Sequence, residues 1–390
     1  MEHTHGGAVY LDHAATTPVD ERVLEAMLPF LREEFGNPSS VHRLGQRARR
    51  ALEEARERLA AAVGARPRDV VFTSGATEAD NQALFGVMGS RPGGLVVGAT
   101  EHPAVLTAAK RLAEAGRDVL FLAPRPDGAL ALEALAAALA EQATRGGTAL
   151  VALMLVNNET GVLTDAAAVA ELAHAHGALY LCDAVQGLGV EPVSLAATGA
   201  DLLTLSAHKV NGPKGVGALV LREGLELPPL LAGGEQERGH RPGTHNLAAI
   251  AGFGVAAELA VAAQPAERER LARLQARFEA EASRLPGVSV NGAGAPRSVK
   301  HSNLRIEGAD GETLLMLLDE AGVYASAGSA CSAGSLDPSH VLLAMGLSRA
   351  QAKASLRFSF GRTTSEAEAI EGVRRLAGAV ARSRPHAADA

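Results

Sequence analysis

From residue 69 to residue 221 the sequence alternates short apolar runs with longer stretches of helical pattern. Strands are predicted at 69–73, 95–98, 118–122, 148–156, 178–183, 202–206 and 217–221, and helices at 77–88, 103–115, 131–144 and 165–176. Repeated strand–helix alternation is typical of a parallel sheet with helices on its faces. We therefore expect an α/β fold whose large domain contains a mostly parallel seven-stranded sheet.

The segments on either side of this region suggest how the chain divides into domains. Helices are predicted at 18–30, with Thr17 as the N-cap, and at 44–63. A loop-rich stretch at 222–246 is followed by a helical tract from 247 to about 285. A chain of 390 residues is long enough for one large and one small domain. We expect a large domain over 17–262 and a smaller α/β domain formed by 1–16 and 263–390.

Charge and cysteine content argue against several classes of function. The net charge is −7 and no long basic run occurs, which argues against binding to nucleic acid or to a membrane surface. The N-terminus lacks the pattern of a signal peptide, and no uninterrupted apolar run is long enough to span a membrane. Two cysteines are too few for a disulfide framework. We expect a soluble, cytoplasmic protein with reduced cysteines.

The strand predicted at 202–206 ends close to a lysine, in the sequence LLTLSAHK (202–209), and a turn with the sequence VNGPKG follows. Lysine is scarce, with 5 in 390 residues. Lysine can form a Schiff base and arginine cannot. Lys209 is therefore a candidate reactive amine, although a surface lysine beside a turn explains the stretch equally well. Lys214, within the turn itself, is interpreted as a surface residue.

Two other strands end in residues suited to ligand binding. Ligands of open α/β sheets bind at the carboxyl ends of the strands. The sequence Ser74-Gly75-Ala76-Thr77 follows a strand and starts a helix, where free N–H groups suit a phosphate, although a plain helix cap explains it as well. Asp183 ends an apolar strand, and a buried carboxylate is costly unless it is paired. With Lys209 it forms the arrangement that a pyridoxal phosphate enzyme needs, an imine-forming lysine and an aspartate that keeps the pyridine ring protonated.

These residues lie within a longer series of motifs that spans almost the whole chain. In order, the motifs are YLDHAATTP (10–18), FGNPSSVH (35–42), FTSGATEADN (72–81), EHPAV (101–105), VNNETG (156–161), DAVQ (183–186), SAHKVNGPKG (206–215), GGEQERGHRPGT (233–244), SAGSACSAGSLDPSHVL (326–342) and SLRFSFGR (355–362). With this series the chain resembles the cysteine desulfurases of NifS/IscS type, in the class-V branch of the fold-type-I pyridoxal phosphate enzymes.

The resemblance implies a set of cofactor-binding residues for pyridoxal 5'-phosphate. Lys209 would carry the cofactor and later move protons, Asp183 would pair with the pyridine nitrogen, and Gln186 would reach the phenolic oxygen. His102 would stack on the ring and take part in catalysis, with helix capping as its alternative role. Thr244 would complete the phosphate site of the neighbouring subunit, which implies a homodimer. The full set is Ala76, Thr77, His102, Asn158, Asp183, Gln186, Ser206, His208, Lys209 and Thr244.

The resemblance also implies L-cysteine as the substrate. Arg357 would bind its carboxylate through paired hydrogen bonds, with a structural salt bridge as the alternative and Arg362 as a competing candidate. Asn158 would lie beside both cofactor and substrate. Asn37 would contact the same carboxylate, or it is a turn asparagine; the sequence favours neither reading.

The two cysteines receive opposite interpretations. Cys331 lies among small polar residues in a loop over about 325–340, a composition that suits an exposed, mobile thiol. By the resemblance it is the nucleophile that takes the substrate's sulfur as a persulfide, releases alanine and passes the sulfur to an acceptor such as an iron–sulfur scaffold protein. It could also ligate an iron–sulfur cluster transiently, and no structural metal site is expected. Cys182, inside the apolar strand LYLCD, is interpreted as a buried structural residue.

Three other functions remain open. A selenocysteine lyase would use the same residues, because selenium and sulfur present nearly the same shape. Another class-V reaction, such as transamination, would need no thiol, and the Cys331 loop argues against it. A non-catalytic sulfur-transfer or scaffold subunit would tolerate loss of Lys209, Asp183 or Cys331, and the sequence retains all three.

Overall fold

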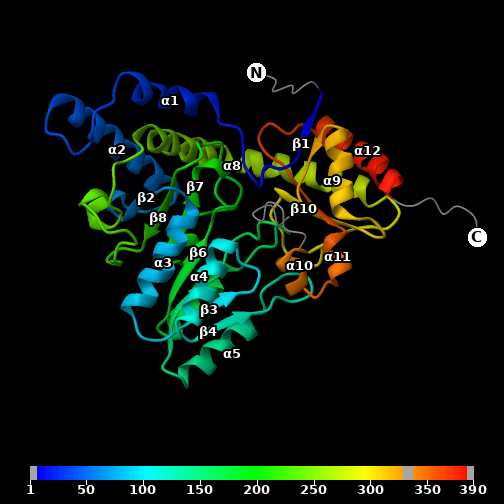
Figure 1. The fold of residues 1–390 in the computed structure, drawn as a ribbon, viewed down its shortest axis with the longest axis horizontal. Helices are drawn as coiled ribbons and strands as arrows, with labels where there is room; N and C mark the ends of the chain where they lie inside the picture. The colour runs from blue at the N-terminus through cyan, green and yellow to red at the C-terminus, as the bar shows by residue number, and fades with distance from the viewer. Residues whose placement is uncertain (1–6, 328–336, 384–390) are drawn as a thin grey trace, which may run out of the picture.

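The computed structural model describes residues 7–327 and 337–383, and its largest element is a mixed seven-stranded sheet (Figure 1). The strand order is β2-β8-β7-β6-β5-β3-β4. Only β8 runs antiparallel, to both β2 and β7; the remaining pairs are parallel, which confirms the predicted sheet. The strands are β2 (Val70–Thr73), β3 (Gly94–Gly98), β4 (Val119–Leu122), β5 (Thr148–Ala152), β6 (Leu179–Asp183), β7 (Leu202–Ser206) and β8 (Gly217–Leu221).

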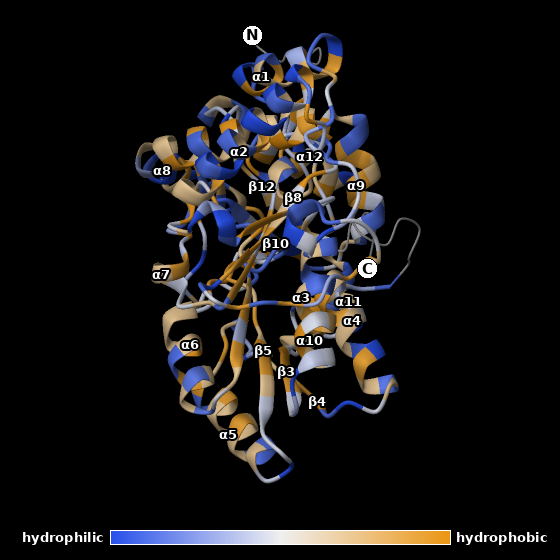
Figure 2. Ribbon diagram, turned by 90° about the vertical axis from the view of Figure 1, so that its left-hand side faces the viewer, coloured by the Kyte–Doolittle hydropathy of each residue, from blue (hydrophilic) through white to orange (hydrophobic). Residues whose placement is uncertain are grey.

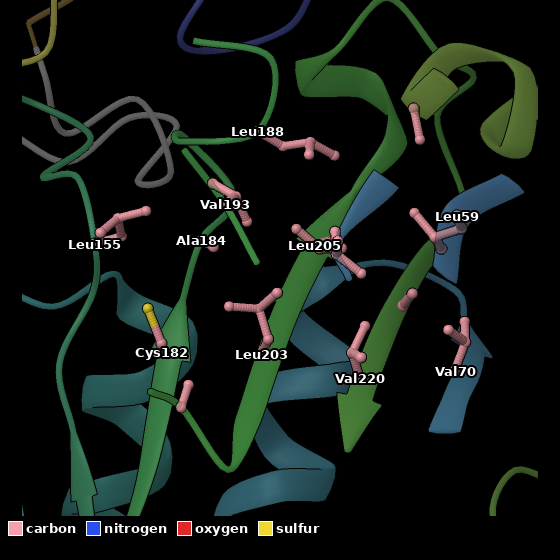
Figure 3. Close-up of a cluster of buried hydrophobic side chains, with 14 of the residues drawn as sticks. Leu59, Val70, Leu155, Cys182, Ala184, Leu188, Val193, Leu203, Leu205 and Val220 are labelled. Carbon is pink, nitrogen blue, oxygen red and sulfur yellow. The ribbon is translucent and has the colours of Figure 1, made fainter. Parts of the chain in front are cut away.

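Both faces of this sheet are covered by helices, because every strand alternates its side chains between two apolar layers. Leu203 and Leu205 of β7 face one layer and Leu202 faces the other. Figure 3 shows the first layer, in which Leu203 and Leu205 lie near Cys182 and Val220. This layer packs against α2 (Arg43–Ala62), α5 (Leu132–Ala143), α6 (Ala166–Ala175) and the first half of α8 (Leu247–Ala282); the other packs against α3 (Ala76–Ser90) and α4 (Pro103–Glu114).

A second group of elements surrounds a separate apolar core. The strands β9 (Val288–Val290), β10 (His301–Ile306) and β12 (Ser355–Ser359) form an antiparallel sheet in the order β12-β10-β9. The second half of α8, with α9 (Gly311–Glu320) and α12 (Glu366–Ser383), packs on it. Two short helices, α10 (His340–Ala344) and α11 (Arg349–Lys353), lie beside these elements in Figure 1. The domain boundaries proposed from the sequence stay a prediction.

The N-terminal arm connects the two groups of elements. It begins with β1 (Val9–Tyr10), which pairs in parallel with β11 (Val323–Tyr324), and then crosses to α1 (Glu21–Arg32) beside the large sheet (Figure 1). The predicted start of α1 was wrong. Asp20, not Thr17, caps the helix, because the Thr17 hydroxyl is engaged with the backbone of His208 and Asn211.

The long helix α8 contains the most apolar stretch of the described chain. By length and composition it is the one helix in residues 7–327 and 337–383 that could cross a membrane, but 61% of that stretch is buried inside the protein. Its first half packs against α1 and α2, and Glu258 interrupts the apolar run. Figure 2 shows that apolar residues lie in the strands inside the molecule, while polar residues lie along the outer faces of the helices. The burial identifies α8 as a core helix of this fold.

Candidate active site

A cavity of about 530 Å³ opens where the parallel strands of the large sheet end. Its walls come from the N-terminal arm, the start of α3, the ends of β6 and β7, the turn after β5, and β12. Parallel strands bring their carboxyl ends to one edge of a sheet, so residues distant in sequence meet there. The predicted residues that line it are Ala76, Thr77, His102, Asn158, Asp183, Gln186, Ser206, His208, Lys209 and Arg357.

Lys209 reaches this cavity from a single 3-10 turn, Ala207–Lys209, that directly follows β7. Its Nζ donates hydrogen bonds to the backbone oxygens of Ala14 (2.6 Å) and Ala15 (2.8 Å). Two carbonyls of the N-terminal arm therefore hold the amine. The sequence had suggested no role for the arm beyond its motif, yet the arm orients the candidate reactive group.

Asp183 lies at the end of β6 and is only 8% exposed. Its Oδ1 accepts the N–H of Val185 at 2.9 Å. Burial raises the pKa of this carboxyl to about 6, while the Val185 hydrogen bond and the charge of Lys209 act in the opposite direction. A buried carboxylate of this kind is stabilised when a cationic ring nitrogen pairs with it, as the sequence interpretation required.

His102 caps a helix and also lies in the cavity wall. Its Nδ1 accepts the N–H of Ala104 (3.1 Å) and so caps α4, while the residue also lines the cavity. Burial lowers the pKa of the imidazole to about 4, helped by Lys209 and His340. The ring is therefore neutral at pH 7, and a neutral imidazole can stack on a flat ligand without opposing its charge.

One part of the cavity wall suits an anion. α3 begins at Ala76 without a side-chain cap, so its first N–H groups face the cavity edge formed with Thr77. Ser206 and His208 lie in the same wall. Burial lowers the pKa of His208 to about 4, so it contributes a neutral ring. Lys214 is exposed, in line with its interpretation as a surface residue, and it also lines the cavity.

Arg357 lies on β12 and is 2% exposed. Its Nη2 pairs with Asp12 (2.7 Å) and its Nη1 donates to the backbone oxygen of Asn158 (2.9 Å). Arg362 pairs instead with Asp20 and does not line this cavity. The geometry therefore favours Arg357 over Arg362 as the carboxylate ligand, with the Asp12 ion pair holding its guanidinium in place.

Two buried side-chain oxygens in the cavity wall, Asn158 Oδ1 and Gln186 Oε1, have no hydrogen-bond partner in the described part of the chain. Such atoms are rare in native structures, and a ligand in the cavity could donate a hydrogen bond to each of these two oxygens. Gln186 is held through its Nε2, which donates to Ala14 O at 2.9 Å. Lys209, Asp183 and the start of α3 fit pyridoxal phosphate, which needs an amine, an acid at its ring nitrogen and an anion site.

Three predicted residues are not brought together in this chain. Asn37 is exposed and its Oδ1 accepts the N–H of Ser39 (2.8 Å), so it is a turn asparagine outside the cavity. Thr244 is also exposed and lies outside the cavity, and its role toward a neighbouring subunit stays a prediction. Cys331 lies outside the described residues. In the ranges that are described, no cluster of three or more His, Cys, Asp or Glu side chains could hold a metal ion.

Cys182 is fully buried, as predicted, among Leu155, Ala184 and Leu203 (Figure 3). Burial raises the pKa of its thiol to about 12. A thiol that stays protonated at every physiological pH is a poor nucleophile, so Cys182 serves the core.

Several buried charged residues near the cavity were missed from the sequence. Asp80 accepts the hydroxyl of Thr204 (2.7 Å), and burial together with Asp183 raises its pKa well above the ordinary value. Glu101 accepts the N–H of Met154 (2.9 Å), and burial raises its pKa as well. The positions of Asp80 and Glu101 inside the motifs TEADN and EHPAV could have marked them as candidate site residues. The buried Lys300 carried no such signal.

The comparisons with known proteins agree with this geometry. The aminotransferase class-V family matches residues 9–371. A cysteine desulfurase from Klebsiella pneumoniae is 44% identical over 92% of this chain and 89% of its own, and one from Frankia sp. is 45% identical over 96% and 92%. A solved NifS-like protein is 33% identical with a TM-score of 0.89, covering 96% of this chain and all of its own. A structure titled SspA in complex with cysteine is 35% identical, with a TM-score of 0.80 and coverage of 90% and 98%.

Proposed function

The chain belongs to the aminotransferase class-V family, and from this premise we propose that it is a pyridoxal phosphate-dependent cysteine desulfurase. The observation that carries the proposal is the position of Lys209, held by two arm carbonyls in a cavity whose wall includes the buried carboxyl of Asp183. The reaction converts L-cysteine to L-alanine and transfers the sulfur to Cys331. The likeness to a structure solved with cysteine supports the choice of substrate.

The side chains around the cavity have separate roles in the reaction. Arg357 binds the carboxylate of L-cysteine, and its pairing with Asp12 fixes the direction of the guanidinium. Lys209 Nζ takes the proton from the α-carbon and returns a proton when the product forms. His102, neutral at pH 7, holds a flat ligand from one face. When bound, pyridoxal phosphate supplies the electron sink for the deprotonated carbon, held by Asp183 at its ring nitrogen and by the start of α3 at its phosphate.

Sulfur leaves the substrate through attack by the Cys331 thiolate on the substrate's sulfur. A sulfur–sulfur bond forms and the carbon–sulfur bond breaks, with its electron pair remaining on carbon. That carbon is then protonated and leaves as L-alanine, while Cys331 holds the persulfide. The reducing cytoplasm predicted for the protein keeps the resting thiol available.

The proposal includes two partners, a second copy of this chain and a sulfur acceptor, and each has its own test. A homodimer would let the exposed Thr244 reach the phosphate site of the second subunit. A sulfur acceptor, such as an iron–sulfur scaffold protein, would receive the persulfide. Size determination in solution and persulfide transfer to a purified acceptor test these two parts separately.

The decisive experiment measures alanine and sulfide released from L-cysteine in the presence of a reductant. Wild type and Lys209→Ala are compared, with Lys353→Met as a control because Lys353 is exposed on α11. The proposal expects release by wild type and the control and none by Lys209→Ala. Equal release by Lys209→Ala would refute it, and a coloured wild type that is active only on selenocysteine would favour the lyase alternative.

A further inference from the structure

A second lysine lies buried directly behind Lys209. Lys300 precedes β10, is 4% exposed, and its Nζ donates to the backbone oxygen of Lys209 at 3.3 Å. Its own carbonyl oxygen accepts the N–H of Phe360 (2.9 Å), which fixes the backbone. Within residues 7–327 and 337–383, no carboxylate lies within ion-pair distance of this ammonium. Lysines are rarely buried without such a partner, so its position calls for an explanation.

The side chain of Lys300 borders a cavity of its own. This second cavity, of about 40 Å³, is lined by both Lys209 and Lys300, so Lys209 forms a wall of this cavity and of the large one. A space of this size is large enough for one water molecule, and the Lys300 side chain borders it among mostly apolar neighbours. Lys300 lines this smaller space and does not line the large cavity.

The charged groups that face Lys300 are mostly cationic. Lys209 and Arg357 act on it directly, and together with burial, the largest cause, they lower its pKa to about 7. Glu267 lines the second cavity from α8 but pairs with Arg270 (2.7 Å), and Arg362 there pairs with Asp20 (2.7 Å).

Two histidines complete the surroundings of Lys300. His13 lies on the N-terminal arm, and His301, the residue after Lys300, begins β10. Burial and the charge of Lys300 lower the pKa of both rings, to about 3 for His13, so both are neutral around pH 7. Lys300 is therefore the group in this buried set that can change its charge near neutral pH.

We propose that Lys300, which donates to the Lys209 backbone and shares the second cavity with it, is a positioning residue whose charge sets the pH response of the reactive amine. The inference rests on the proposed function, because it takes Lys209 as the amine that forms the Schiff base. Charged Lys300 disfavours a second positive charge on Lys209, and neutral Lys300 removes that effect. The two amines then titrate as a coupled pair rather than independently.

Two substitutions hold Lys300 in its two charge states. Lys300→Met keeps the aliphatic stem without charge, and Lys300→Arg keeps a permanent charge. The readout is the pH midpoint of the visible absorbance change of the cofactor bound to Lys209, which requires no cysteine and no turnover. For two unit charges about 10 Å apart at an effective dielectric constant of about 20, the effect is roughly one pH unit.

The expected result is a midpoint that moves up in Lys300→Met and down in Lys300→Arg relative to wild type, with Lys353→Met unchanged. A structural role alone would move both variants in the same direction or leave both unchanged, and either result would overturn the proposal. The titration does not depend on desulfurase activity. If the two Lys300 variants shift in opposite directions but Lys209→Ala still releases alanine from cysteine, the proposed substrate chemistry is refuted and the role of Lys300 is not. A wild type without the absorbance band overturns both.

The effect of Lys209 on the titration of Lys300 gives an independent measurement if a Lys300 variant does not fold. Labelling the lysine side chains with ¹³C at Cε gives at most five signals for this chain. We expect one of them to titrate near neutral pH in wild type and at higher pH in Lys209→Ala, because a neighbouring cation is lost. A neutral-range signal that does not move between the two proteins would overturn the proposal, as would the absence of any such signal.

Discussion

Replacing Glu237 with glutamine is expected to lower the free energy of unfolding by about 3 kcal/mol. Glu237 is fully buried and receives four hydrogen bonds: two from Arg56 (2.7 and 2.8 Å), one from the N–H of Phe72 (2.8 Å) and one shared with His245 (2.8 Å). The network holds Glu237 and Arg238 in left-handed backbone conformations, with φ of 49° and 58°. Residues other than glycine adopt this region only when their surroundings stabilise it.

The magnitude follows from the pKa of the carboxyl. The hydrogen bonds and charge of Arg56 lower the pKa of Glu237 from 4.5 to about 2 against the opposing effect of burial. At about 1.4 kcal/mol for each pKa unit, this difference corresponds to about 3 kcal/mol. Breaking a buried ion pair on one side costs a similar amount, about 3–5 kcal/mol. Because the folded pKa is depressed, the contribution is present above pH 4.5 and is lost as pH falls toward 2.

Thermal unfolding followed by circular dichroism checks this prediction. A chain of 390 residues has an unfolding entropy of about 0.8 kcal/mol/K, so Glu237→Gln should lower Tm by about 4 °C at pH 7. Glu53→Gln is the matched control, since Glu53 bonds the same Arg56 (3.1 Å) from a half-exposed position. It should lower Tm by less than about 1 °C. Equal shifts for the two variants would refute the argument from burial.

Three further predictions concern the cavity and the core. Arg357→Lys should raise KM for L-cysteine about tenfold or more, because lysine lacks the fork that bonds both Asp12 and a carboxylate; an unchanged KM in steady-state assays would assign the carboxylate to another residue. Asp183→Asn should raise the free energy of unfolding of the cofactor-free protein at pH 7 by on the order of 2–3 kcal/mol. Because the folded pKa is raised to about 6, the native carboxyl destabilises the fold fully above pH 6 and not at all below pH 3.8. The gain in Tm should therefore disappear in acid. Cys182 should resist iodoacetamide in the folded protein and react after denaturation, as counted by mass spectrometry, and labelling in the native state would contradict its burial.

The elements that carry Lys209, Asp183 and Thr77 could be predicted because each feature of their sequence acts locally. Apolar runs of strand length give the sheet, and the order of strand and helix gives parallel pairing. Strand ends then collect at one edge whatever the rest of the chain does, so residues placed there by sequence also meet in space. The buried position of Cys182 followed from the same reasoning.

The contacts that depend on long-range packing could not be predicted in this way. The arm carbonyls of Ala14 and Ala15 bond Lys209 through the backbone, which leaves no trace in side-chain identity. Lys300 has the sequence context of a surface residue, and only the packing of β10 behind the lysine turn buries it. The true start of α1 was hidden for the same reason, since the hydroxyl of Thr17 is taken by a residue far along the chain.

The N-terminal arm has a consequence for how the protein is made. Ala14 bonds Ser359 and Asp12 bonds Arg357, and each pair is separated by 345 positions. At a translation rate of about 5–20 residues per second, the arm waits roughly 20–70 s after leaving the ribosome before those partners are synthesised. The large sheet can form during that interval, whereas Lys209 gains its final surroundings only after nearly the whole polypeptide has been released. Incomplete chains therefore carry an exposed first strand and an unfinished site, which makes premature termination products natural clients of chaperones and proteases.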